Sequence, residues 1–257
     1  LGSLLERLGD EDMWYGLMRR RAVFPETVLA LSYAQAGQWP TAQASMEATL
    51  QKARNGVIGY LSSEYALWER NWYQSAKALQ QWDFVGEVAK IDNDAELQLE
   101  ALWHSADWSA VETQGTAVGL LKLGVGGSNN RVDVRKKCVE GLLLLEQLRD
   151  SPDKLPRFHS VIEEAMAMGM KEWWMLPTRP AGCHAHVLES FQSIVELQEA
   201  QLVFANLSIH QHPSHSRQPF LQELKGLLGT WRDRLPNQHD RLSVWSDVLA
   251  WRQHVYS

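Results

Sequence analysis

The stretch YAQAGQW, residues 33–39, followed directly by PTAQASMEATL, residues 40–50, decides the fold. Gly37 suits the exit of a helix, where a left-handed backbone is common. Pro40 suits the first turn of the next helix, because its missing N–H has no partner to lose there. The stretch therefore predicts a helix, a short turn and a second helix.

Two more turns resemble this one, and both contain a tryptophan. They are ALQQWDF around Trp82 and HSADWSA around Trp108. An indole ring is costly to leave in water, so the tryptophan of each turn should pack against another part of the protein. We expect Trp39, Trp82 and Trp108 to lie mostly buried at hairpin corners, each wedged against the neighbouring hairpin. The alternative is that each ring only folds back onto its own hairpin.

The rest of the chain also follows helical periodicity, and no segment alternates apolar and polar residues over five or more positions between turn signals. Asn93 with Glu96, and Ser109 with Glu112, have the spacing of capping boxes. The expected helices span 11–21, 25–36, 40–54, 63–80, 83–91, 94–105, 109–122, 132–149, 153–168, 170–176, 183–207, 217–234 and 241–256.

Helix, short turn and helix in repetition predict an all-α chain, an α-solenoid of tetratricopeptide-like or HEAT-like hairpins. We assign residues 1–257 to one such solenoid. GVGGSNN, residues 124–130, is expected to form a flexible break, and SIHQHPSHSRQP, residues 208–219, a polar loop. The chain lacks an initiator Met and stops within a helical pattern, so we expect it to be part of a longer protein.

Composition excludes several classes of protein. The formal net charge of −6 and the pI near 5.9 argue against a nucleic-acid binder that works by neutralising phosphates. Two cysteines, Cys138 and Cys183, suit a reducing compartment and provide no disulfide framework. The longest apolar run, GLLLL at 141–145, is far short of a membrane span, and no secretory signal is present.

Candidate chemical sites are weak throughout the sequence. GVGG at 124–127 lacks the lysine and hydroxyl residue of a phosphate-binding loop. Two clusters could supply metal ligands, but they lie at opposite ends of a predicted helix of about 24 residues, roughly 36 Å apart. Carboxylate pairs on predicted helices are interpreted as solvated faces. We therefore predict no catalytic residue, no cofactor and no metal site. The two histidine-rich clusters are Cys183, His184 and His186, and His210, His212 and His215, and the carboxylate pairs are Glu163–Glu164 and Glu196–Glu199.

Several unusual strings carry a family resemblance from about Leu4 to Tyr256. They are EDMWYGLMRRR, YAQAGQWPTAQASMEATLQKA, EYALWERNWYQSAKALQQWD, KEWWMLP, IVELQEA and TWRDRLPNQHDRLSVWSDVLAWRQHVY. Together they resemble the FAT region of the phosphatidylinositol-3-kinase-related kinase family, in its pseudokinase branch. No short motif among them allows binding residues to be carried over.

The resemblance implies a nuclear, non-catalytic scaffold segment of a large subunit in histone acetyltransferase coactivator complexes. The implied partners are other subunits of SAGA-type and related complexes, the kinase-like domain of the same parent chain and, at a further step, transcription activators. It implies neither direct nucleic-acid binding nor a membrane. Two alternatives stay open: the FAT region of an active kinase of the family, and a stand-alone tetratricopeptide-like interaction module.

Overall fold

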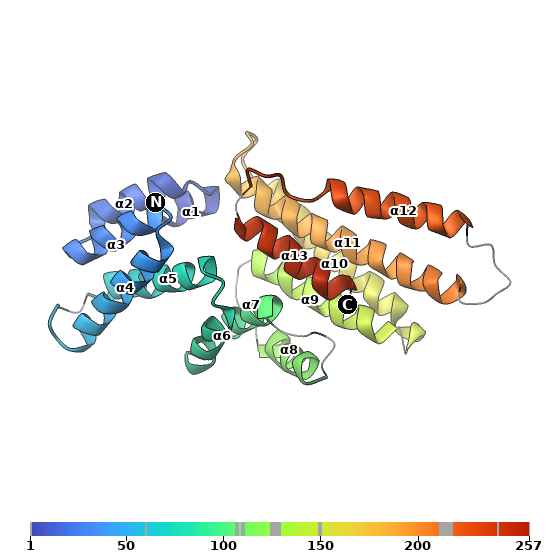
Figure 1. Cartoon of the computed structure of the whole chain (residues 1–257), viewed down its shortest axis with the longest axis horizontal. Coiled ribbons are helices and arrows are strands. Elements are labelled where there is room, and N and C mark those ends of the chain that lie inside the picture. The colour runs from blue at the N-terminus through green and yellow to red at the C-terminus, as the bar shows by residue number, and fades with distance from the viewer. Residues whose placement is uncertain are drawn as a thin grey trace. The chain divides into compact units, whose positions relative to one another are not determined.

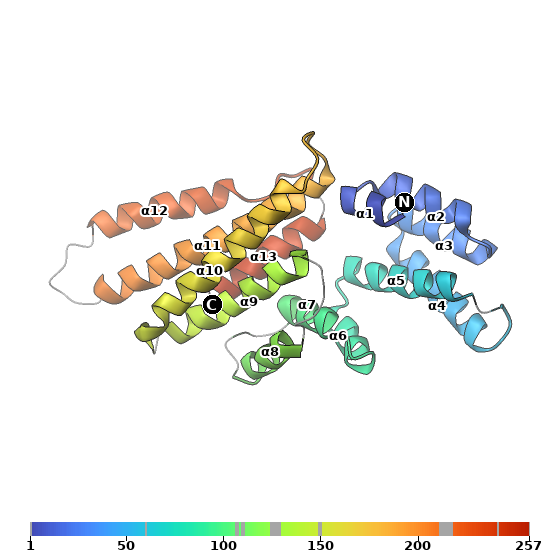
Figure 2. The same cartoon turned by 180° about the vertical axis from the view of Figure 1, so that it is seen from behind.

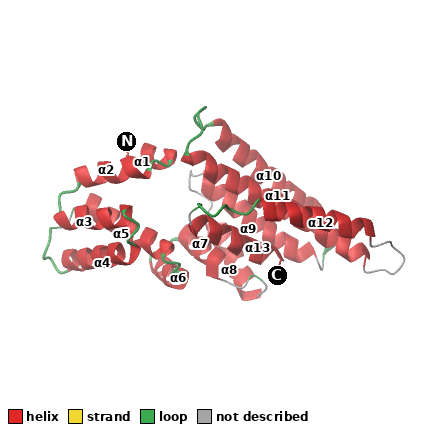
Figure 3. Ribbon diagram, turned by 45° about the horizontal axis from the view of Figure 1, so that its top comes forward, coloured by secondary structure: helices red, strands yellow, loops and turns green. Residues whose placement is uncertain are grey.

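In a computed structural model, helix follows helix along the chain (Figure 1). The structure describes residues 2–59, 61–105, 108, 111–123, 130–148, 151–210, 218–240 and 242–256. Within these ranges there is no strand (Figure 3), which confirms the prediction of an all-α chain. The elements are α1 Gly2–Leu8, α2 Glu11–Arg21, α3 Pro25–Gln35, α4 Trp39–Arg54, α5 Ser62–Ala78, α6 Trp82–Ile91, α7 Ala95–Ser105, α8 Val111–Leu123, α9 Asn130–Leu148, the 3-10 turn Pro152–Lys154, α10 Leu155–Trp174, α11 Gly182–His210, α12 Gln218–Asp233 and α13 Leu242–Tyr256.

The chain divides into two compact units. Unit 1 comprises residues 1–101 with 177–183, and unit 2 comprises residues 102–176 with 184–257. The boundary falls inside α7. In unit 1, helices that follow one another along the chain pack together from α1 to α6, and α3 also contacts α5. In unit 2, α9 packs against both α8 and α10. Packing between sequential helices is the arrangement expected of helical hairpin repeats.

One backbone motif ends most helices of unit 1. After α3, Gly37 adopts a left-handed backbone with φ 71°. The N–H of Gln38 then donates to the carbonyl of Tyr33 at 2.9 Å, and the N–H of Gly37 donates to that of Ala34 at 3.0 Å. This is the Schellman motif, which satisfies carbonyls that a helix end would otherwise leave without partners. The next helix, α4, begins at Trp39, two residues after the left-handed one.

The same motif recurs where glycine is absent. After α5, Gln80 is left-handed with φ 59°, and the N–H of Gln81 donates to the carbonyl of Ala76 at 3.0 Å. After α6, Asn93 has φ 56° and the N–H of Asp94 donates to the carbonyl of Ala89 at 3.0 Å. Trp82 begins α6 as Trp39 begins α4. The turns AGQW and LQQW are therefore equivalent corners, although only one has glycine at the left-handed position.

The structure corrects three local expectations. Asn93 ends α6, and Asp94 caps α7 instead, with its Oδ1 accepting from the N–H groups of Glu96 and Leu97 at 3.0 Å each. The separate helices expected at 153–168 and 170–176 are one helix, α10, which passes through Gly169. The segment 2–8, which had no expected helix, forms α1.

The two expected irregular segments lie largely outside the described residues. These parts are 124–129 within the expected break and 211–217 within the expected loop. Two of the flanking helices extend further than expected, since α9 begins at Asn130 and α11 continues to His210, while α12 begins at Gln218, within one residue of its expected start.

Candidate functional site

A buried carboxylate on α11 holds α13 in unit 2. The Glu196 side chain is fully buried. Arg252 of α13 donates to it twice, from Nη2 to Oε1 at 2.8 Å and from Nε to Oε2 at 3.2 Å. Gln192 Nε2 adds a donor at 3.1 Å to Oε1. A buried charge is tolerated when it is paired and hydrogen-bonded in this way, so the contact fixes where α13 sits on α11.

A second carboxylate, one helical turn further along α11, holds the end of α12. Trp231 Nε1 donates to Glu199 Oε2 at 2.7 Å. Arg234 forms a two-point pair with the same group, from Nη1 to Oε2 at 2.7 Å and from Nη2 to Oε1 at 2.9 Å. The strings TWRDRLP and WRQHVY thus contain the residues that attach α12 and α13 to α11.

These two glutamates correct the interpretation of Glu196–Glu199 as a solvated pair. Their spacing suits an exposed helix face just as well, so spacing alone could not separate the two cases. A signal was available in the flanking sequence: Glu196 lies in IVELQEA, with apolar residues on both sides. An acid within such a run requires a buried cation, and Arg252 supplies it.

An aromatic cluster joins α7 to α13 in unit 2. Trp103 stacks on Trp251, with ring centroids 4.9 Å apart and planes inclined by 17°. Trp108 and His254 both meet Trp103 edge-on, at 6.1 and 5.8 Å. His254 Nε2 contacts the carbonyl oxygen of Trp103, near the C-terminal end of α7. All four side chains are buried, so the cluster closes the core at this end of unit 2.

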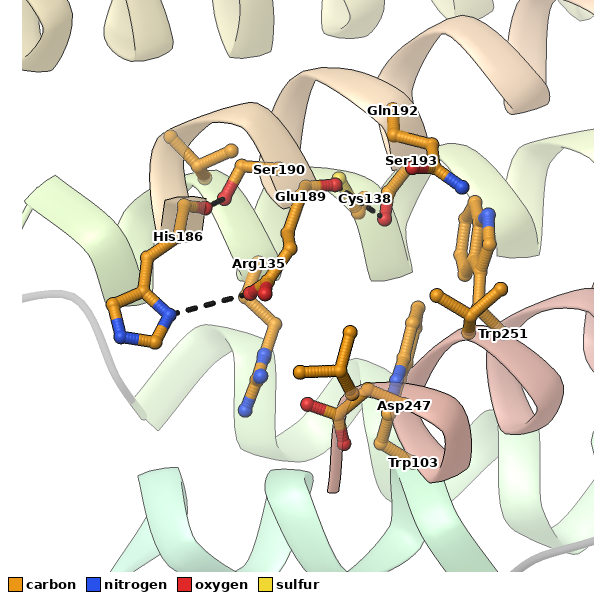
Figure 4. A pocket seen from close by; sticks show the side chains of 13 residues that line it. Trp103, Arg135, Cys138, His186, Glu189, Ser190, Gln192, Ser193, Asp247 and Trp251 are labelled. Atoms are coloured by element: carbon orange, nitrogen blue, oxygen red, sulfur yellow. Dashed lines mark hydrogen bonds and ion pairs between the residues drawn. The ribbon is translucent and has the colours of Figure 1, made fainter. Parts of the chain in front are cut away.

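A small pocket of about 80 Å³ opens beside this cluster, between α7, α9, α11 and α13 (Figure 4). Its apolar lining comes from Trp103, Val134, Cys138, Val244, Val248 and Trp251, and its polar lining from Arg135, His186, Glu189, Ser190, Gln192, Ser193 and Asp247.

The acids that line this pocket contact histidines. His186 Nδ1 lies 3.2 Å from Glu189 Oε2, and Asp247 Oδ1 lies 3.4 Å from Nε2 of the buried His104. Burial raises the pKa of the Cys138 thiol to about 12, so the sulfur stays protonated and is a poor nucleophile. The pocket thus offers two acid–histidine contacts and a protonated thiol.

Unit 1 contains its own buried polar network. Glu64 of α5 accepts hydrogen bonds from the backbone N–H of Val23 and from the Thr27 hydroxyl, at the N-terminal end of α3. Trp68 Nε1 donates to the same hydroxyl at 2.7 Å. Glu64 therefore acts as the N-terminal cap of a helix two elements earlier, with negative charge at the positive end of the helix dipole. Trp68 lies within the string LWERNW, and Glu64 lies shortly before it.

The three corner tryptophans occupy different environments. Trp39 is half-buried and packs against the core that contains Trp14, Leu31 and Met46. Trp82 is 8% exposed, and its Nε1 donates to Gln80 Oε1 at 2.9 Å. Trp108 is 2% exposed within the aromatic cluster. Trp39 and Trp82 belong to unit 1 and Trp108 to unit 2. That each ring acts as a wedge between hairpins stays a prediction.

The candidate metal ligands take part in other contacts. His184 packs edge-on against Trp173 at 5.5 Å, His186 contacts Glu189, and Cys183 is buried. His212 and His215 lie outside the described residues. Across the described part of the chain, no three His, Cys, Asp or Glu side chains are placed to hold a metal ion, and no helix is long and apolar enough to cross a membrane.

Comparison with known proteins shows the family to which this chain belongs. A family model described as the FAT domain matches residues 95–257. The chain belongs to the FAT domain family. The match begins with α7 and includes every unit 2 element described above. Both glutamate–arginine contacts and the aromatic cluster therefore lie within the FAT match.

Relatives extend the similarity over the whole chain. The Saccharomyces cerevisiae "SAGA complex/NuA4 acetyltransferase complex subunit TRA1" is 37% identical over 99% of this chain, and its Schizosaccharomyces pombe counterpart, of the same description, is 34% identical over 100%. The human "Transformation/transcription domain-associated protein" is 31% identical over 100%. The chain spans only 7%, 7% and 6% of the lengths of these relatives. The matched stretch is thus a small part of each relative.

Proposed function

We propose that this chain is a non-catalytic scaffold segment of a large subunit of SAGA-type and NuA4-type histone acetyltransferase complexes, in a protein of the TRA1 and transformation/transcription domain-associated protein kind. The observation that carries the proposal is similarity to named SAGA and NuA4 subunits across essentially the full chain. Its partners are other subunits of those complexes and the kinase-like domain of its own parent protein, with transcription activators as further partners. Its location is the nucleus.

The internal contacts support a mechanical role. In unit 2, ion pairs with low solvent access fix α12 and α13 to α11, and in unit 1 a buried carboxylate fixes α3 to α5. Networks of this kind give a unit one defined shape when every member has its partner. A scaffold requires such a shape together with broad surfaces, whereas an enzyme requires titratable groups converging in a cleft. The relatives' names favour the acetyltransferase subunit over the FAT region of an active kinase and over a stand-alone module.

A chimera tests this role directly. The matching segment of the Saccharomyces cerevisiae relative is replaced by this chain, and SAGA and NuA4 are purified through other subunits. We expect the chimera to be recovered in both complexes, with histone acetyltransferase activity retained. As a control, Arg252→Met in the chimera should reduce recovery, because it leaves Glu196 unpaired. A chimera that is stable in cells yet absent from both complexes would refute the scaffold role.

A further inference from the structure

The surface of α11 is open on the side between α10 and α12. Phe191 of α11 packs on α10, since a Cβ atom added to Gly169 would lie 2.9 Å from the Phe191 ring. Glu199 of α11 binds Trp231 and Arg234 from α12. At 100° per residue, Glu199 lies about 80° around the helix from Phe191. α10 and α12 therefore flank one strip of α11 (Figures 1 and 2).

Apolar residues spaced by seven occupy this strip. Leu188, Val195 and Leu202 lie about 60°, 40° and 20° around from Phe191, between the lines that face α10 and α12. Leu188 is 54% exposed and Leu202 58% exposed, while Val195 is half-buried. Residues spaced by seven drift by only about 20° per step around a helix, and this is the spacing with which one helix packs along another. The strip thus offers a helix-shaped seat about 21 Å long.

α10 forms an apolar wall along the seat. Met166, Met170 and Trp173 lie about 40° to 100° around α10 from Gly169, on the side that faces the strip. Met170 is 42% exposed and Trp173 39% exposed. The edge-on contact between Trp173 and His184 places the Trp173 ring beside the first turn of α11. We call Met166, Met170, Trp173, Leu188, Val195 and Leu202 the α10–α11 seam.

The charge beside the α10–α11 seam is negative. Glu163 lies on the outer edge of α10, one turn from Met166. Glu223 lies on α12. Around that helix it is displaced from Trp231 toward the side that borders the strip. Both residues are exposed, and neither forms an ion pair within the described residues. An apolar seam bordered by two free carboxylates complements an apolar stripe bordered by cations.

We propose that the α10–α11 seam docks an amphipathic helix of a partner protein, with aliphatic anchors at heptad spacing and Lys or Arg along both edges of its apolar stripe. This inference deepens the proposed scaffold role and rests on it. Exposed Trp, Met and Leu in one patch are unusual for a surface without a partner. Met side chains adapt to varied anchors. Trp, the residue type at position 173, is enriched among the residues that dominate the binding energy of protein interfaces.

The test uses this 257-residue chain and two fluorescein-labelled peptides. Both are helices of about 21 residues, or three heptads, with Leu at the a and d positions. One carries Lys at the e and g positions and the other Glu. We expect fluorescence anisotropy to show saturable binding that is about tenfold tighter for the Lys peptide.

Matched variants locate the binding. Leu188→Asn with Leu202→Asn should weaken binding of the Lys peptide about tenfold, whereas Leu249→Asn, at a similarly exposed site on α13, should leave it within about twofold. Glu163→Lys with Glu223→Lys should reverse the preference toward the Glu peptide, and Glu47→Lys on α4 should not. Circular dichroism melting checks that each variant stays folded.

Three results would overturn the docking proposal: no saturable binding of either peptide, equal binding by the seam and control variants, or a preference for the Glu peptide in the unmodified chain. Sedimentation covers a fourth outcome. A dimer that disappears with Leu188→Asn and Leu202→Asn would make a second copy the occupant and would also overturn it. If the peptide binds at the seam but the chimera does not assemble into the complexes, the scaffold role is refuted. The docking proposal then still holds.

Discussion

Arg252 of α13 meets the fully buried carboxylate of Glu196 with two nitrogen atoms, at 2.8 and 3.2 Å. Removing one member of such a pair leaves the other charge in a site without water. We expect Arg252→Met to lower the free energy of unfolding of unit 2 by about 3–5 kcal/mol, measured by chemical denaturation.

Two further variants separate the ion pair from the size of the side chain. Arg232→Met is the matched control, because the Arg232 side chain is 76% exposed and its one ion pair within the described residues is with its neighbour Asp233. It should change stability by less than about 1 kcal/mol. Adding Glu196→Leu to Arg252→Met should restore much of the loss. Equal effects of Arg252→Met and Arg232→Met would contradict the role assigned to the buried pair.

Thr27 stands at the centre of the unit 1 network, receiving a hydrogen bond from Trp68 and donating one to Glu64. Thr27→Val keeps the shape but removes the hydroxyl, which leaves a buried donor and a buried acceptor without this partner. We expect a loss of about 1–3 kcal/mol in thermal or chemical unfolding. Thr49→Val is the control, since among the described residues the buried Thr49 hydroxyl bonds to the carbonyl of Ser45 in its own helix and to no other group. If both substitutions cost the same, the network adds nothing specific.

Gly37 and Gly16 should respond to alanine with opposite signs. Gly37 has φ 71°, a conformation in which a Cβ atom costs about 1–2 kcal/mol, so Gly37→Ala should destabilise. Gly16 is exposed inside α2 with nothing within 4 Å of an added Cβ, so Gly16→Ala should stabilise by about 0.5–1 kcal/mol. Differential scanning calorimetry of both variants decides the point, and a stabilising Gly37→Ala would show that this corner needs no left-handed residue.

The corner tryptophans should differ in their contribution to stability. Trp82 and Trp108 are buried, and replacing either with alanine should cost about 3–5 kcal/mol. Trp39 is only half-buried, so Trp39→Ala should cost less. Melting temperatures of the three variants give the order. An unchanged melting temperature for Trp82→Ala or Trp108→Ala would contradict a wedge at that corner.

Glu164 links stability to pH. The hydrogen bond from Lys137, at 2.7 Å, holds the pKa of Glu164 below its ordinary value of 4.5. A carboxyl whose pKa is lower in the folded state stabilises the fold above its unfolded pKa, and this contribution is lost as pH falls through the folded pKa. Glu164→Gln should therefore cost up to about 1 kcal/mol at pH 7, and nothing once both forms are protonated in acid.

The neighbouring position supplies the control for this pH dependence. Glu163→Gln changes an exposed carboxylate that forms no ion pair within the described residues, so it should alter stability little at pH 7. Across pH 3–7, the urea midpoint should differ from that of the parent in a pH-dependent way for Glu164→Gln, and it should stay close to that of the parent for Glu163→Gln. A constant difference between Glu164→Gln and the parent at all pH values would show that the Lys137 contact has no electrostatic role.

Sequence patterns predicted the helices because periodicity and caps act locally. Gly37 and Pro40 were sufficient to place the α3–α4 corner. Gly169 misled the prediction, because glycine signals a break locally whereas here its missing side chain makes room for the Phe191 ring from another helix. Glu196 was missed for the same reason: its partner, Arg252, lies 56 residues away. The apolar residues beside Glu196 indicate that it is buried, but no local pattern identifies a partner so far along the chain.

The Schellman corners have a consequence for how the chain is made. Each is closed by hydrogen bonds that span no more than six residues, as from Gln81 to Ala76. Loops of that size close within about 10–100 ns, far faster than the ribosome adds about 5–20 residues per second. The direction of each new helix is therefore set as soon as the first residues after the corner emerge. We therefore expect α1 to α6 to fold in order along the chain, each hairpin docking on the one already formed, with Glu64 securing α3 only when α5 arrives.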